Sequence, residues 1–193
     1  MLSCDEADVR QTLLDSGIVV ESLLEVLKRE HSSDHWRMEV LWSLSYALAS
    51  ENSAQVGQCL RFGVLDPIIH FINRNETYAQ EVVHEACWCL ANALMHGSAQ
   101  EDLPDIAKLS GLMPALIIAL SQPTRTLIDT AIIGTLKLVE YGNTLDTNDS
   151  SNPFLGYIHT HAIGIIEEHA QTGSEEAKTI LHYFTSDNNG HNF

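Results

Sequence analysis

A glycine-centred pattern that returns about every 46 residues is the feature that most constrains the fold of this chain. Three segments share it, each with a glycine, then an apolar stretch, then a polar break: 15–27, 61–72 and 109–120. Their glycines, Gly17, Gly63 and Gly111, stand 46 and 48 residues apart. A period of about 40–47 residues is typical of solenoids whose repeats each hold two or three helices. The chain is therefore predicted to be an all-α solenoid whose repeats bury their apolar faces against each other.

A tryptophan motif repeats in the same phase. Residues 39–46 read EVLWSLSY and residues 85–92 read EACWCLAN, so that the two tryptophans lie 46 residues apart. Apolar residues recur at helical spacing along most of the chain. The repeated glycines are expected to take positive φ angles, which close one helix and turn sharply into the next. Each unit is then predicted to hold a short helix before the glycine, a medium helix after it, and a longer helix that carries the tryptophan.

The repeats predict one domain over residues 1–184. Its units are expected near 12–51, 52–97, 98–142 and 153–184, with helices near 155–171 and 174–184 in the last unit. The polar segment 142–152 predicts a loop. The segment 185–193 is expected to be a disordered tail.

Composition and charge narrow the class of partner. The chain has 193 residues, of which 45% are hydrophobic, and its formal net charge is −16. Such a charge repels the phosphates of nucleic acid and favours basic partners, although acidity also serves solubility alone. No apolar run is long enough to span a membrane. The four cysteines lie mostly in apolar helical stretches, which favours buried thiols in a reducing compartment.

The sequence offers no site for catalysis or for a cofactor. His84, Cys87, Cys89 and His96 include metal-ligating types, but Cys89 points away from the helix face that His84 and Cys87 share, and no four-ligand spacing results. His159 and His161 diverge on a helix in the same way. The histidines have no partnered serine or cysteine nucleophile, and there is no glycine-rich phosphate loop. We therefore expect a binding module without metal or cofactor, rather than an enzyme.

The motif at residues 85–92 resembles the inner-helix motif of importin-alpha, the nuclear-import adaptor, and residues 109–115 (LSGLMPA) resemble the turn into that family's middle helix. Residues 152–154 (NPF), 165–168 (IIEE) and 182–184 (HYF) resemble the family's last repeat in order and rough spacing. The resemblance covers about residues 12–184. It implies the last three to four repeats of a right-handed armadillo superhelix, found in cytoplasm and nucleus, with a concave groove for nuclear localisation peptides.

The groove residues implied by this resemblance have suitable chemistry. They are Glu39, Trp42 and Tyr46 in one unit, and Glu81, Glu85, Trp88 and Asn92 in the next. An indole face packs a lysine or arginine stem, an asparagine amide pins an extended backbone, and carboxylates attract the cationic heads. Tyr46 replaces the family's asparagine, so one clamp is lost. In the following unit Ile133 and Lys137 occupy the positions of the tryptophan and the asparagine. The series of peptide-binding positions therefore ends there, and Lys137 is expected to place a cation in the groove.

Other interpretations of these residues stay open. Trp42 and Trp88 also fit a helical core, and Trp36 is expected to be a packing residue at a helix start. Glu167 and Glu168 fit either a solvated face or a contact with an importin-beta-type export receptor, which the resemblance implies. The alternative function is a divergent armadillo scaffold that binds another protein or self-associates.

Overall fold

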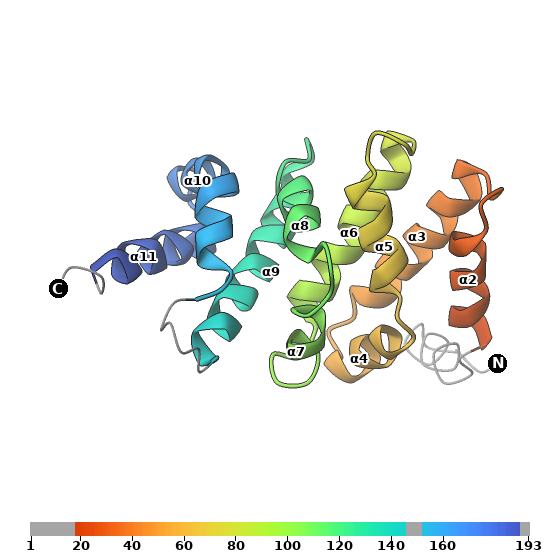
Figure 1. Ribbon diagram of the computed structural model, residues 1–193, viewed down its shortest axis with the longest axis horizontal. Helices are drawn as coiled ribbons and strands as arrows, with labels where there is room; N and C mark the ends of the chain where they lie inside the picture. Colours follow the sequence, from red (N-terminus) through yellow and green to blue (C-terminus); the bar gives the residue numbers. More distant parts are fainter. Residues whose placement is uncertain (1–17, 146–151, 190–193) are drawn as a thin grey trace, which may run out of the picture.

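The computed structural model describes residues 18–145 and 152–189, and all the regular secondary structure in these two stretches is helical (Figure 1). The first unit holds α2 (Ile18–Lys28) and α3 (Asp34–Leu48), and the second holds α4 (Ser53–Arg61), α5 (Leu65–Asn73) and α6 (Gln80–His96). The third holds α7 (Leu103–Ile106), α8 (Leu112–Leu120) and α9 (Arg125–Thr144), and the chain continues with α10 (Leu155–Gln171) and α11 (Glu175–Asn189). The predicted three helices per unit are confirmed in the second and third units.

The helices stack in two parallel rows that follow the long axis of the molecule (Figure 1). We call α3, α6 and α9 the long-helix row: α6 packs against α3 on one side and α9 on the other, and α11 packs against α9. The middle-helix row runs from α2 through α5 and α8 to α10, each helix packing against the next. The short helices α4 and α7 lie along one edge of both rows (Figure 1). Each unit thus buries its apolar faces against its neighbours, as a solenoid requires.

The repeated glycines take the predicted left-handed conformation. Gly63 has φ 73° and Gly111 has φ 80°, values that side-chain-bearing residues rarely adopt. Gly17 lies outside the described residues. The Nδ2 group of Asn73, at the end of α5, donates to the Gly111 carbonyl over 2.9 Å. The glycine turn of one unit is therefore hydrogen-bonded to the end of the middle helix before it.

The seam between α6 and α9 depends on a glycine that no sequence pattern singled out. A Cβ atom at Gly134 would lie 2.6 Å from Leu94 Cβ and 3.6 Å from the Ala91 carbonyl oxygen. Only a hydrogen in place of the side chain permits this approach. Leu90 and Leu94 of α6 are fully buried in the core on the same helix.

The C-terminal boundaries differ from the prediction. Helix α9 extends to Thr144, so it includes the first three residues of the expected loop, and residues 146–151 lie outside the described part. At the far end of the loop Asn152 is buried: its Nδ2 donates to the Val139 carbonyl (2.6 Å) and its Oδ1 accepts from Phe154 N (3.0 Å). Helix α11 continues to Asn189, so the expected tail is helical over its first five residues. No described helix is long and apolar enough to cross a membrane.

Candidate peptide-binding face

Two hydrogen bonds set the register between α3 and α6. The Cys89 thiol donates to the Leu41 carbonyl over 3.1 Å, and the Asn92 amide donates to the Ser45 carbonyl over 3.2 Å. Trp88 precedes Cys89 and Trp42 follows Leu41, so the two tryptophans lie at the same level on neighbouring helices. The pairing that the 46-residue period predicts is therefore present in the packed structure.

The α3 part of this face is open to solvent. The Trp42 side chain is 61% exposed and Tyr46 is 53% exposed, one turn further along the helix. Glu39 is also exposed, one turn before Trp42. The alternative that Trp42 belongs to the core is therefore wrong, because an indole in the core would be shielded from water. An open indole beside a carboxylate offers a cationic side chain both a π-face and an opposite charge.

The α6 part is more enclosed. Trp88 is half-buried against the core, and its Nε1 donates to His84 Nε2 over 3.2 Å, with the two rings edge to face. Glu81 is exposed, whereas Glu85 is half-buried. Burial raises the pKa of Glu85, and the charge of the neighbouring His84 acts in the opposite direction. The bond to His84 was not predicted, although His84 and Trp88 stand at the i, i+4 spacing that brings side chains together on a helix.

Asn92 does not present its amide nitrogen to a groove. Only 7% of the residue is exposed, and its Nδ2 donates to both the carbonyl and the hydroxyl oxygen of Ser45 (3.2 and 3.1 Å). The expectation that this amide clamps a peptide backbone is not met, because the donor is used in the α3–α6 seam. Asn92 thus joins two repeats.

The expected cation at Lys137 is also turned inward. Lys137 Nζ donates to the carbonyls of Met95 (2.5 Å) and Gly97 (3.3 Å), at the C-terminal end of α6. Carbonyls at a helix end lack intrahelical partners and carry partial negative charge, so this lysine caps α6. The cation that Lys137 was expected to place in the groove is thus engaged at the end of α6. Ile133 is half-buried and offers no flat aromatic face.

The remaining predicted positions, Trp36, Glu167 and Glu168, are exposed on the surface. Trp36 is 62% exposed, so its expected role as a packing residue is wrong. It lines an open hollow at the α2–α3 connection. Glu167 and Glu168 are exposed on α10, which fits a solvated face and a contact surface equally.

The cysteines are packing residues. Cys59, Cys87 and Cys89 are buried free thiols, as predicted, and Cys4 lies outside the described residues. Burial raises the pKa of the Cys59 and Cys87 thiols to about 12. Thiolates are therefore scarce at neutral pH, and these side chains are poor nucleophiles. Among the described residues, no group of three or more metal-ligating side chains comes together.

Comparisons with known proteins relate the chain to one kind of fold. No family model matches the sequence, and no curated protein does. Similar solved structures include the designed armadillo repeat protein YIII(Dq)4CqI, with a TM-score of 0.63 and 16% identity over 90% of this chain and 65% of the design. Another is the designed armadillo repeat protein YIII(Dq.V1)4CPAF in complex with peptide (KR)4, with a TM-score of 0.56 and 17% identity over 90% of this chain and 82% of the design. The fold is therefore an armadillo-type α-solenoid of several repeats.

Proposed function

We propose that this chain is a protein-binding module that holds an extended basic peptide across α3 and α6. One observation carries the proposal: Trp42 and Trp88 stand at one level on adjacent helices that also bear three carboxylates, and Trp42 is open to solvent. The carboxylates are Glu39, Glu81 and Glu85. Packed helices lie about 8–10 Å apart, and an extended chain advances about 3.3 Å per residue. Basic side chains two or three residues apart would then meet successive tryptophans.

The wider charge of the molecule supports this partner. A net charge of −16 attracts basic segments from a distance and raises their rate of encounter. One of the structurally similar designs is in complex with a peptide of alternating lysine and arginine, which supports the choice of ligand. The face is short, because Ile133 and Lys137 do not extend it onto α9. We therefore propose modest affinity and a short recognised segment.

The resemblance to importin-alpha supports a finer proposal. The basic segments would be nuclear localisation signals, and the chain would act in nuclear import, in the cytoplasm and the nucleus. Glu167 and Glu168, both exposed on α10, are proposed as contacts for an importin-beta-type export receptor. These assignments rest on the resemblance and on exposure alone.

The test is the affinity of a labelled (KR)4 peptide, measured by fluorescence anisotropy at low and physiological salt. Trp42→Ala is expected to weaken binding roughly three- to tenfold, because a cation–π contact at an exposed site contributes about 0.5–1 kcal/mol and the indole also covers the side-chain stem. Affinity should fall steeply with salt, since the carboxylates act through space.

Trp36→Ala is the matched control. Trp36 and Trp42 lie on the same helix with nearly equal exposure, but Trp36 faces the hollow at the α2–α3 connection. Its removal should leave the affinity unchanged. Equal losses in both variants, or no binding of the peptide at low salt, would refute the proposal and favour a scaffold for a different partner.

A further inference from the structure

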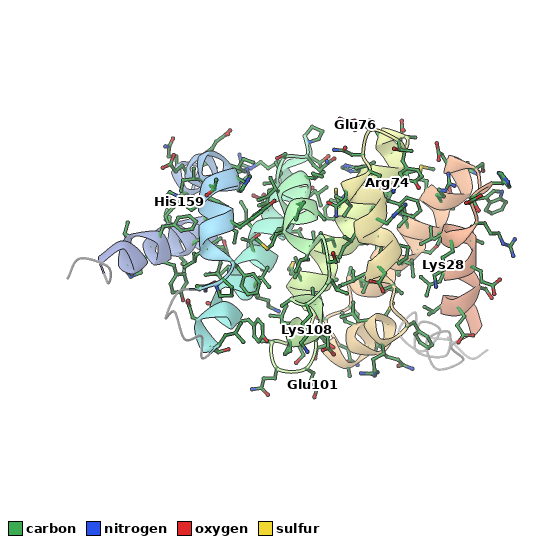
Figure 2. The ribbon with its side chains drawn as sticks, in the orientation of Figure 1. Lys28, Arg74, Glu76, Glu101, Lys108 and His159 are labelled. Carbon is green, nitrogen blue, oxygen red and sulfur yellow. The ribbon has the colours of Figure 1, made fainter. Side chains whose placement is uncertain are left out.

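A second charged surface lies between α2 and α5, formed by the ends of these helices and the segments that follow them. A groove of about 740 Å³ is present there. It gathers four of the ten lysines and arginines of the whole chain: Lys28, Arg29, Arg37 and Arg74. Figure 2 shows Lys28 on α2 and Arg74 at the end of α5, on either side of the space between the two helices. We call this surface the α2–α5 groove.

The groove is less acidic than the molecule as a whole. Three carboxylates also line the groove, from Glu30, Asp34 and Asp66. Asp34 is already paired with Arg37 at 2.9 Å. The cations of the groove thus outnumber its carboxylates in a chain whose net charge is −16. Arg29 is paired with Glu25, so the cations of the groove without an ion pair among the described residues are Lys28 and Arg74.

Arg37 forms a rigid wall of the groove. Its guanidinium donates to Asp34 and to the carbonyls of Arg29 (3.4 Å) and Glu30 (3.0 Å), and its carbon lies 5.3 Å from the centre of the Tyr78 ring. Only 11% of the side chain is exposed. These contacts fix the connection between α2 and α3, and with it the positions of the neighbouring cations.

Lys28 and Arg74 are available to a ligand. Both side chains are exposed, and neither forms an ion pair with any residue in the described ranges 18–145 and 152–189. Arg29 is only loosely paired with Glu25, at 3.6 Å. Between the two free cations, His70 and Tyr78 meet through a hydrogen bond of 3.2 Å and add polar atoms to the wall.

We propose that the α2–α5 groove binds a short acidic segment of a partner protein, with Lys28 and Arg74 each taking a carboxylate or phosphorylated side chain. The cations come from separate elements along an open groove, which fits a chain better than one compact anion. A long polyanion such as nucleic acid would extend beyond the groove and meet the acidic remainder of the molecule. This site takes ligands of the opposite charge to those proposed for α3 and α6, so each proposal can fail alone.

The test uses a labelled octapeptide of alternating glutamate and aspartate, followed by fluorescence anisotropy at low and physiological salt. Wild type should bind it, more weakly as salt rises. The double variant Lys28→Ala/Arg74→Ala should bind about fivefold or more weakly, the expected loss for two partly exposed charge contacts. The control Lys108→Ala/Lys178→Ala removes the same charge from exposed sites on other units, where each lysine pairs with a nearby carboxylate. It should retain wild-type affinity.

The outcomes separate the sources of the anion. Binding that persists in millimolar inorganic phosphate, and that Trp42→Ala does not change, supports a segment-binding groove distinct from the α3–α6 face. Displacement by low-millimolar phosphate would assign a site for free anions and overturn the proposal. Tighter binding of a single-stranded oligonucleotide, equal losses in both double variants, or no binding at low salt would overturn it as well.

Discussion

Helices α3 and α6 carry the same repeated motif in different surroundings. Helix α6 is packed by α3 on one side and by α9 on the other, whereas α3 meets a long helix, α6, on one side. Trp42 is 61% exposed while its counterpart Trp88 is half-buried. Tyr46 is half exposed while Asn92 is almost completely buried. Equivalent positions in a solenoid thus serve as surface or as seam, according to how many neighbours their helix has.

Because of this difference, equivalent positions in successive units have different roles. The first offers the open indole on which recognition of a basic peptide is proposed to depend. The second and third units use the corresponding positions to join repeats: Asn92 of α6 bonds to Ser45, and Lys137 of α9 bonds to the end of α6. A substitution in the α3–α6 or α6–α9 seam should therefore act on stability, and a substitution on the exposed face that α3 and α6 share should act on binding.

The largest expected effect on stability comes from disturbing the seam between α6 and α9. Gly134→Ala places a Cβ atom 2.6 Å from Leu94 Cβ, so the helices must separate or shift. Overpacking of this kind costs about 1–3 kcal/mol, more than the helix propensity that alanine adds. The free energy of unfolding, measured by urea denaturation, should fall by about 2 kcal/mol.

Gly164→Ala is the matched control for this prediction. Gly164 also lies within a helix, but a Cβ atom there would have no neighbour within 4 Å. The same substitution should then stabilise the protein by up to about 1 kcal/mol, because alanine is the better helix former. If both variants change stability alike, the close approach of α9 to α6 is not a determinant of the seam.

A smaller effect on stability is expected at the seam between α3 and α6. Asn92→Ala removes both hydrogen bonds to Ser45 and should lower the free energy of unfolding by about 1–2 kcal/mol. Tyr46→Ala, at the equivalent place in α3, should cost about 0.5 kcal/mol or less, because more than half of that side chain is exposed. Chemical denaturation of the two variants side by side checks the difference. Equal losses would mean that exposure does not distinguish the two units.

The architecture could be predicted from the sequence because its determinants are periodic. The glycine turns at Gly63 and Gly111 and the long helices with Trp42 and Trp88 follow from spacing and from the conformational freedom of glycine. These features act within one repeat. Each is visible in the residues that cause it, and the structure confirms them.

The roles of single side chains were harder to predict because they depend on contacts between repeats. Asn92 was expected to bind a peptide backbone and Lys137 to place a cation in the groove, but each bonds to a neighbouring helix about 40–47 residues away in sequence. Trp36 was expected to pack and is exposed. Hydrophobic periodicity gives the face of a helix, but it does not say whether another helix covers that face.

The smallest expected effect is a change in the pH dependence of peptide affinity when Glu85, rather than its counterpart Glu39, is replaced. Burial raises the pKa of Glu85, so this carboxylate loses its charge at a higher pH than an ordinary glutamate as the solution is acidified. On acidification from pH 7, affinity for a basic peptide should therefore begin to fall earlier than an ordinary glutamate would cause. Glu85→Gln removes this early loss, and the difference from wild type should be less than about threefold.

Glu39→Gln serves as the control, because Glu39 occupies the equivalent, exposed position on α3. It should keep the wild-type dependence of affinity on pH. A raised pKa also means that ionised Glu85 destabilises the folded state above that pKa. Glu85→Gln should thus leave stability at pH 7 unchanged or slightly higher, while it weakens binding there. A variant that loses stability instead would show that Glu85 supports the α3–α6 seam and not a ligand.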